Sequence, residues 1–221
     1  APACRFDARV PKAAMSARRA FVKRAFDLVL AVPALLAALP LLAALALWVR
    51  VDSPGPALFR QRRVGRGGRL FRIHKFRTMQ VGGGDGPQVT AAGDARVTRA
   101  GRWLRATKLD ELPQLIDVVK GDMSLVGPRP QVPRFMAQYP DDVRQRILSV
   151  RPGITDRAAI EFRDEERLLA AAPDPEAAYV QRIMPVKQRY YLEYVAHHSL
   201  QGDLRILLDT ARALWTREKS A

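Results

Sequence analysis

The feature that most constrains this chain is a stretch of 22 residues, 28–49, that contains no charged side chain. A continuous helix of that length measures about 33 Å, which is enough to cross the hydrocarbon core of a bilayer. The competing interpretation is a helix buried in a protein core, although globular helices of this length usually show a polar face. The stretch therefore favours a membrane helix, with a buried core helix as the alternative.

Two prolines and the flanking charges argue against a simple crossing. Pro33 and Pro40 interrupt the apolar stretch, and a proline inside a helix clashes with the preceding turn and bends the axis. Both flanks are basic, and the positive-inside tendency would keep both ends on the cytoplasmic side. The basic residues are Arg18, Arg19, Lys23 and Arg24 before the stretch and Arg50, Arg60, Arg62 and Arg63 after it. We therefore predict a re-entrant helix-break-helix, broken at Pro40, that enters one leaflet and returns.

A second informative stretch, residues 107–130, contains an acidic pair at a predicted helix start. Asp110 and Glu111 precede Pro113, which is tolerated in a first helical turn, and Gly121 supplies a stop after several apolar residues at helical spacing. The alternative interpretation is simple capping, because acidic side chains are common in the first turn of a helix.

Two arginines flank this pair in the sequence. Arg105 precedes it, and Arg129 follows the predicted helix within a stiff Gly-Pro-Arg-Pro turn. A helix start offers free N–H donors and positive partial charge, which suit a phosphate as well as carboxylates. Two carboxylates and two arginines in this arrangement indicate a site for a charged phosphate ester.

Composition narrows the class of partner. The formal net charge of +15 implies an acidic partner, which can be nucleic acid, an anionic membrane surface or a polyphosphate substrate. The single cysteine, Cys4, excludes an intrachain disulfide and a cysteine-based metal cluster, and three scattered histidines do not indicate a zinc site.

The remaining patterns predict a mainly helical α+β protein. Residues 57–64 and 69–79 alternate like two short strands joined by a glycine-rich hairpin, on which Lys75 and Arg77 are candidate phosphate contacts, a solvated strand face being the alternative. Near the C-terminus an apolar stripe at helical period predicts an amphipathic helix, either packed on the core or lying in the headgroup plane. We predict four segments: a tail at 1–17, the basic collar and membrane helix at 18–51, a compact cytoplasmic catalytic domain at 52–198, and the amphipathic helix at 199–221.

Seven short motifs in order resemble the bacterial sugar transferases, the small monotopic phosphoglycosyl transferases. The resemblance covers nearly the whole chain. The motifs are Lys-Arg-x-Phe-Asp at 23–27, Gly-Pro at 55–56, Phe-x-Gln-x-Arg-x-Gly at 59–65, Lys-Phe-Arg-Thr-Met at 75–79, Leu-Asp-Glu-Leu-Pro-Gln at 109–114, Gly-Asp-Met-Ser-Leu-Val-Gly-Pro-Arg-Pro at 121–130 and Arg-Pro-Gly-Ile-Thr at 151–155. Each motif alone is weak, whereas all seven in sequence are specific.

The resemblance implies an enzyme that moves a sugar 1-phosphate from a UDP-sugar to a polyprenyl (undecaprenyl) phosphate and releases UMP. Asp110 would be the nucleophile that forms an aspartyl phosphosugar, with Mg²⁺ held partly by Asp110 and Glu111. Glu111 would position the metal or deprotonate the incoming polyprenyl phosphate. The family would place the enzyme on the bacterial inner membrane, in contact with lipid, with its catalytic domain facing the cytoplasm.

The resemblance also assigns substrate phosphate contacts. Arg105 and Arg129 match family positions that hold phosphate, where the bidentate geometry of arginine serves better than lysine. Lys75 and Arg151 are carried over in the same role.

The sequence departs from the common family pattern at two places. Leu39 precedes Pro40 where many relatives have serine, which removes a hydroxyl that could satisfy a freed carbonyl. After the Gly-Ile-Thr turn the chain reads Asp-Arg-Ala-Ala-Ile at 156–160, where many relatives read Gly-Trp-Ala-Gln. The second change leaves the identity of the donor sugar open.

Two rival functions belong to other classes. A membrane-anchored basic protein that binds nucleic acid would explain the charge but not Asp110 and Glu111, because carboxylates repel a phosphate backbone. We therefore expect no nucleic-acid partner. A non-catalytic membrane scaffold that keeps the fold is the other rival, and the intact acidic pair argues against it.

Overall fold

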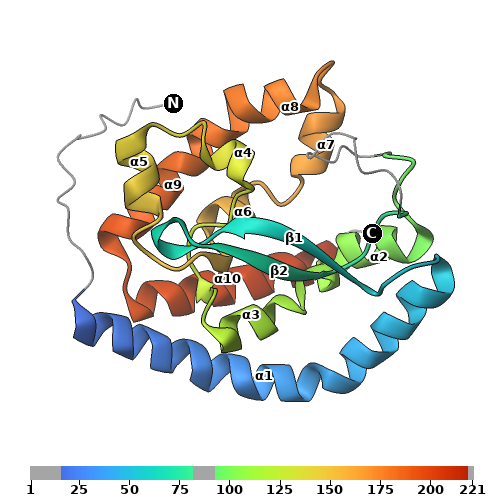
Figure 1. Cartoon of the computed structure of the whole chain (residues 1–221), viewed down its shortest axis with the longest axis horizontal. Coiled ribbons are helices and arrows are strands. Elements are labelled where there is room, and N and C mark those ends of the chain that lie inside the picture. Colours follow the sequence, from blue (N-terminus) through green and yellow to red (C-terminus); the bar gives the residue numbers. More distant parts are fainter. Residues whose placement is uncertain (1–15, 82–92, 219–221) are drawn as a thin grey trace.

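In the computed structural model, which describes residues 16–81 and 93–218, one long helix lies beneath a body of short helices and two small sheets (Figure 1). The predicted tail at 1–17 lies outside the described residues except for its last two. The helices are α1 (Ala17–Asp52), α2 (Arg99–Thr107), α3 (Gln114–Lys120), α4 (Pro133–Met136), α5 (Asp141–Ile147), α6 (Arg157–Glu161), α7 (Glu165–Ala170), α8 (Pro175–Ala178), α9 (Met184–His197) and α10 (Leu200–Glu218). Single turns are η1 (Arg66–Gly68), η2 (Leu109–Glu111) and η3 (Tyr179–Ile183), and the strands are β1 (Leu58–Val64), β2 (Leu70–Phe76), β3 (Ser124–Val126) and β4 (Gly153–Thr155). The predicted mainly helical α+β class is confirmed.

The apolar stretch forms part of α1, which remains helical through both Pro33 and Pro40. The helix bends along its length, so that its two ends rise toward the body on either side (Figure 1). The expected helix-break-helix is therefore a bent helix without a break, since each proline removes only one backbone hydrogen bond from a helix of 36 residues. The re-entrant path through a membrane stays a prediction.

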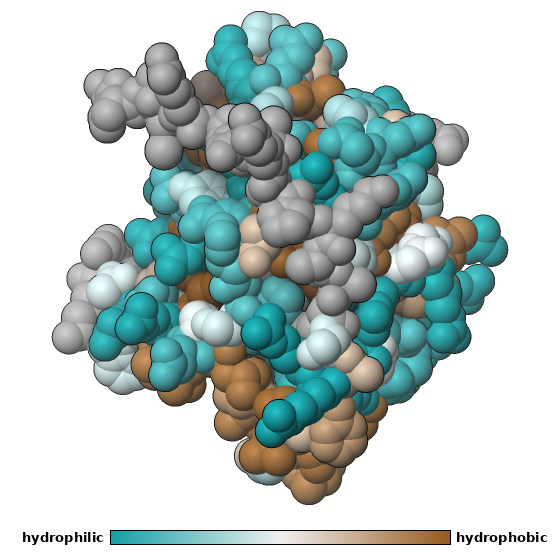
Figure 2. Space-filling model, turned by 90° about the vertical axis from the view of Figure 1, so that its left-hand side faces the viewer, coloured by the Kyte–Doolittle hydropathy of each residue, from teal (hydrophilic) through white to brown (hydrophobic). Residues whose placement is uncertain are grey.

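α1 is not a core helix. By length and composition it is able to cross a membrane, and only 11% of its most apolar 18-residue window is buried in the protein. Ala31, Leu45 and Val49 are among the few residues that it buries. Apolar side chains gather along the lower edge of the molecule in Figure 2, where Figure 1 places α1. The exposed apolar residues of the helix include Val29, Val32, Leu36, Leu39, Leu41, Leu47 and Val51.

The predicted hairpin is present as the antiparallel pair β1 and β2. Its register aligns Leu58 with Phe76 and Val64 with Leu70. Gly67 and Gly68 have φ of 65° and 81°, a left-handed conformation that glycine adopts without steric cost. The hairpin lies above α1 and α3 and brings β2 beside the turn that carries the acidic pair (Figure 1).

A short parallel pair, β3 and β4, joins two of the motifs. Ser124 aligns with Gly153 and Val126 with Thr155. Gly127 and Gly153 lie so close that a Cβ on either would meet the backbone of the other, which explains glycine at both positions. This pairing links the Gly-Pro-Arg-Pro turn to the Arg-Pro-Gly-Ile-Thr turn and was not predicted from the sequence.

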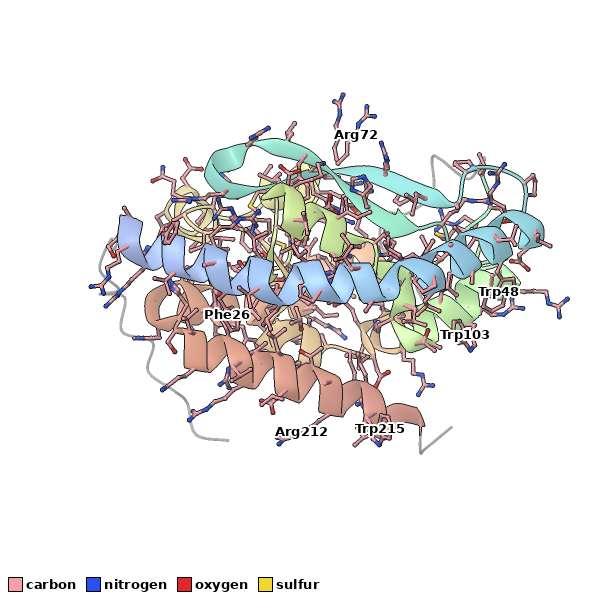
Figure 3. The ribbon with its side chains drawn as sticks, turned by 90° about the horizontal axis from the view of Figure 1, so that it is seen from below. Phe26, Trp48, Arg72, Trp103, Arg212 and Trp215 are labelled. Atoms are coloured by element: carbon pink, nitrogen blue, oxygen red, sulfur yellow. The ribbon has the colours of Figure 1, made fainter. Side chains whose placement is uncertain are left out.

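The C-terminal helix α10 packs on the core with one side and exposes apolar residues on the other, so it agrees in part with each of the two predicted alternatives, a helix on the core and a helix in the headgroup plane. Its inner side contributes Ile206, which is buried, and Leu207 to the core that also contains Ala31 of α1. Its outer side exposes Leu204, Leu208, Leu214 and Trp215. In the view from below, α10 runs alongside α1, with Trp215 near its far end (Figure 3).

Candidate active site

The acidic pair lies in a tight turn between α2 and α3. α2 is followed by Lys108 in the left-handed region, with φ of 59°, the only such non-glycine residue in the described part of the chain. The 3₁₀ turn η2 then contains Asp110 and Glu111, and α3 begins only at Gln114, after Pro113. Because the pair precedes α3 rather than occupying its first turn, capping of that helix does not account for it.

Asp110 is buried and is held through one oxygen only. The Nζ of Lys75, on β2, lies 2.6 Å from Asp110 Oδ2 and 3.6 Å from Glu111 Oε1. The other oxygen, Asp110 Oδ1, is also buried and has no hydrogen-bond partner among the described residues. Since buried carboxylate oxygens are normally satisfied, an unpartnered Oδ1 on a residue that lines a cavity marks a position where a ligand can bind or react.

Glu111 has a different environment, because Arg129 binds both of its oxygens. Arg129 Nη1 lies 2.9 Å from Glu111 Oε2, and Nη2 bonds to Oε1. Burial acts to raise the pKa of Glu111, but the charges of Arg129 and Lys75 outweigh it and hold the pKa well below its usual value. The charge of Glu111 in turn raises the pKa of Arg129. Glu111 is therefore a firmly ionised anchor for Arg129 and a weak base.

Arg105 approaches the site from α2. Its Nε donates to Thr78 Oγ1 at 2.9 Å, and its Nη1 lies 3.3 Å from Glu166 Oε1. Glu166 is the more exposed partner, so this pair is accessible to solvent and can be exchanged for a substrate anion.

Two other predicted phosphate contacts bind backbone carbonyls instead. Arg151 Nε donates to the Gly121 carbonyl at 3.0 Å, and Arg151 lines neither cavity described below. Arg77 donates to the Pro54, Pro56 and Ser53 carbonyls, at 2.6, 2.8 and 2.8 Å. Arg77 thus caps the C-terminal end of α1, and the geometry gives Arg151 no support as a phosphate contact.

Sequence reasoning missed a buried lysine beside the site. Lys187 of α9 pairs with Glu165 and lies over the rings of Phe162 and Tyr179, with its Nζ 5.8 and 5.3 Å from their centroids. The two charged residues are distant in the sequence and belong to none of the seven motifs, so no spacing signal was available to identify them.

Two cavities meet at these residues. The larger, of about 1460 Å³, is strongly basic, with nine cationic side chains against two carboxylates. Its cations are Arg50, Arg60, Arg63, Lys75, Arg77, Arg96, Arg105, Arg129 and Lys187. The smaller, of about 500 Å³, contains Asp110 and Glu111 and has mostly apolar walls from α3, α6 and α10. Lys75, Arg105, Arg129, Glu165, Glu166 and Lys187 line both cavities.

The site fits a magnesium ion that takes most of its ligands from a substrate. In the described ranges, no cluster of three or more His, Cys, Asp or Glu side chains could hold a metal without help. Mg²⁺ commonly binds through one or two carboxylates together with substrate phosphates, and Asp110 Oδ1 offers one such oxygen. Glu111 has both oxygens bonded to Arg129, so the predicted second protein ligand is already engaged.

The Lys-Arg-x-Phe-Asp motif holds α1 against the site from below. Arg24 donates to the carbonyls of Val118 and Val119, at 2.6 and 2.9 Å, and so caps the C-terminal end of α3. Asp27 Oδ1 accepts from Lys23 Nζ at 2.7 Å and from the backbone N–H of Leu125 at 3.2 Å. The motif therefore has a structural role, which fixes the helix that follows the acidic pair.

A buried pair positions the strand that carries Lys75. The carboxylate of Asp117, on α3, accepts from the backbone N–H of His74 at 2.8 Å and lies 2.6 Å from His74 Nδ1. This contact fixes β2 to α3 one residue before Lys75, and so sets the distance between Lys75 and Asp110.

Comparisons with known proteins agree with the motifs. A family model described as bacterial sugar transferase matches residues 18–217. The UDP-glucose:undecaprenyl-phosphate glucose-1-phosphate transferase of Caulobacter vibrioides is 41% identical over 96% of this chain and 74% of its own length. The UDP-N-acetylgalactosamine-undecaprenyl-phosphate N-acetylgalactosaminephosphotransferase of Aeromonas hydrophila is 38% identical over 89% of this chain, which spans only 44% of that protein. The exopolysaccharide production protein PSS of Rhizobium leguminosarum bv. phaseoli is 37% identical over 90% of this chain and 97% of its own length.

Proposed function

The chain belongs to the bacterial sugar transferase family, and on that premise we propose that it transfers a sugar 1-phosphate from a UDP-sugar to a polyprenyl phosphate, with release of UMP. The observation that carries the proposal is the position of Asp110. Its carboxylate is fixed by Lys75, keeps one oxygen without a partner, and lines the smaller, mostly apolar cavity next to Lys75, which lines the basic cavity as well. A soluble nucleotide and a lipid acceptor would reach the same carboxylate from these two sides.

In the first half of the proposed reaction, Asp110 attacks the phosphorus that bears the sugar. A bond forms between the carboxylate oxygen and phosphorus, the bond from phosphorus to the bridging oxygen breaks, and UMP leaves with that electron pair. Lys75 orients Asp110 through their ion pair, while Arg105 and Arg129 line the basic cavity, where they would bind the diphosphate of the donor. Mg²⁺ bound by Asp110 and the donor phosphates would neutralise the charge that develops on the leaving group.

In the second half, an oxygen of the polyprenyl phosphate attacks the aspartyl phosphosugar. The new bond joins the two phosphates, the bond to Asp110 breaks, and the carboxylate recovers its electron pair. A phosphate monoester is largely a dianion at neutral pH, so this step needs no general base. The low pKa of Glu111 is consistent with that conclusion and favours a positioning role through Arg129.

The proposed site is the cytoplasmic face of the bacterial inner membrane, with α1 inserted as a bent helix. The exposed apolar surface of α1 would be costly in water and is satisfied by lipid. The rings of Trp48 and Trp103 pack with their centroids 5.3 Å apart and their planes tilted by 58°, where α1 meets α2 (Figure 3). Tryptophans are enriched at the boundary between membrane and water, so this pair supports the proposed position of α1 at the face of the membrane.

The decisive experiment replaces the nucleophile. Asp110→Asn should reduce UMP release from UDP-sugars by more than 10³-fold and abolish covalent labelling by a donor labelled in its sugar phosphate. Asp122→Asn is the matched control, because Asp122 follows α3, pairs with Lys120 and lines neither cavity. Substantial UMP release by Asp110→Asn, or labelling at another residue, would remove Asp110 from its proposed role.

A second experiment tests the membrane path. Single cysteines at Arg19 and Val51, both exposed at the ends of α1, are introduced in a Cys4→Ser background. In intact spheroplasts a membrane-impermeant maleimide should label neither cysteine, and in opened membranes it should label both. Labelling of one end only in intact spheroplasts would show that α1 spans the bilayer.

A further inference from the structure

The smaller cavity does not match the chemistry of a nucleotide-sugar. Its walls include Leu112, Ile160, Leu207 and Leu214, from η2 and its continuation, α6 and α10. A nucleoside diphosphate sugar is polar along its whole length, and the basic cavity on the other side of Lys75 provides for it. The apolar walls suit a hydrocarbon that approaches Asp110 from the α10 side.

Two cations, Arg163 and Lys108, line this cavity alone, and Arg163 donates to the Ala213 carbonyl at 3.0 Å. Lys108 lines the smaller cavity but not the larger one, and its side chain forms no hydrogen bond or ion pair within the part of the chain that the structure describes. Lys75, Arg129 and Lys187 are each paired with a carboxylate. An ammonium group at the wall of a mostly apolar cavity gains from an added anion.

The backbone holds Lys108 close to the nucleophile. Lys108 occupies the left-handed position that ends α2, two residues before Asp110, and its carbonyl accepts from the N–H of Glu111 at 3.3 Å. The non-glycine φ of 59° is sterically unfavourable, and such conformations concentrate at functional sites.

We propose that the smaller cavity binds the polyprenyl phosphate acceptor, with its phosphate on Lys108 and its first isoprene units against Leu112, Ile160 and Leu207. This inference rests on the proposed function and adds the location of the second substrate. The exposed residues Leu204, Leu208 and Trp215 continue from the cavity along the outer side of α10. Figure 3 shows that α10 lies alongside α1, so lipid that surrounds α1 would have a short apolar path to the cavity.

The first test measures binding and needs no turnover. Full-length protein in detergent is titrated with farnesyl phosphate, with farnesol and with inorganic phosphate. Lys108→Met should raise the Kd for farnesyl phosphate at least 10-fold while changing the Kd for farnesol less than 2-fold, and Lys108→Arg should restore most of the affinity. Ala211→Phe, at the rim of the cavity on α10, should raise the Kd for both prenyl compounds. Lys120→Met is the matched control, because Lys120 is exposed and lines neither cavity.

The second test separates the two substrates. In the full reaction, Lys108→Met and Ala211→Phe should raise the KM for polyprenyl phosphate at least 10-fold more than the KM for the UDP-sugar. An equal rise for both substrates, a larger rise for the donor, or wild-type affinity for farnesyl phosphate in both variants would overturn the assignment. A wild-type protein that binds farnesyl phosphate through Lys108 but releases no UMP would uphold the site and refute the proposed reaction.

Discussion

Two buried ionic clusters of similar composition differ in their access to a cavity. The cluster at the site joins Lys75 to Asp110, whose Oδ1 has no hydrogen-bond partner within the described part of the chain and whose side chain lines the smaller cavity. The second cluster lies where α1 meets α10, and its Lys23 Nζ lies 2.7 Å from Asp27 Oδ1 and 3.1 Å from Asp203 Oδ2.

The second cluster is closed to both cavities, although Asp27 Oδ2 is also buried there without a hydrogen-bond partner among the described residues. Tyr194 donates to Asp203 at 3.0 Å, and the backbone N–H of Leu125 donates to Asp27. The side chains of Lys23, Asp27 and Asp203 line neither cavity. Burial raises the pKa of Asp203, although the charge of Lys23 opposes this effect. A perturbed carboxylate by itself therefore does not identify a functional site, because structural ion pairs perturb pKa values too. Access to substrate distinguishes the two clusters.

Among the variants that test this difference between the two clusters, Lys75→Met should have the largest effect, and it acts on the rate of UMP release. The variant should lower the rate of UMP release per folded molecule by about 10³-fold, roughly 4 kcal/mol in the barrier, because Asp110 loses the charge that orients it. The measurement is steady-state UMP release with saturating UDP-sugar. Lys120→Met, an exposed lysine on α3, should keep wild-type turnover. Near-normal turnover by Lys75→Met would place the two clusters in the same structural class.

The converse change is Asp27→Asn in the closed cluster. Removing one partner of a buried pair leaves Lys23 less compensated and should reduce the free energy of unfolding by about 3 kcal/mol. Turnover per folded molecule should remain within 2-fold of wild type, because Asp27 lines neither cavity and contacts neither Asp110 nor Lys75. Chemical denaturation in detergent measures the first quantity and UMP release the second. A loss of turnover without a loss of stability would contradict the structural role.

The sequence predicted the elements whose signals are local. The hairpin followed from strand alternation and its glycines, and the stop at Gly121 from the left-handed position that glycine favours. The acidic pair was identified, but the separate 3₁₀ turn that carries it was not. The 3₁₀ turn lies before Pro113 and α3 begins after it, and the sequence pattern of two such elements cannot be distinguished from that of one helix. Likewise, the apolar stretch predicted a bend at Pro40 and could not show that the helix continues through it.

Features that depend on the tertiary fold could not be predicted. Lys187 of α9 and Glu165 of α7 meet only in the folded protein. Lys108 lines the smaller cavity only because residues of α10 form part of that cavity's wall. Arg77 looked like a phosphate contact because it follows Lys75 by two residues, yet it caps α1. Arg77 follows the last residue of β2 and reaches carbonyls of a turn that lies 21 to 24 residues earlier, which spacing along the chain does not reveal.

The smallest effect on the free energy of unfolding is expected at the partly accessible pair Glu111–Arg129, which we compare with the closed cluster. Glu111→Gln should cost about 1 kcal/mol of stability at pH 7, less than Asp27→Asn, because Arg129 remains partly exposed and water can solvate it. The pKa of Glu111 is lower in the folded protein than its ordinary value, so its contribution is complete above that ordinary value and declines as the pH falls below about 4.5. The difference in unfolding free energy between wild type and Glu111→Gln, measured from pH 7 down to pH 3, should therefore shrink as the pH falls. A difference that grew as the pH fell would mean that folding raises the pKa of Glu111, and the ion pair with Arg129 would then not be its dominant interaction.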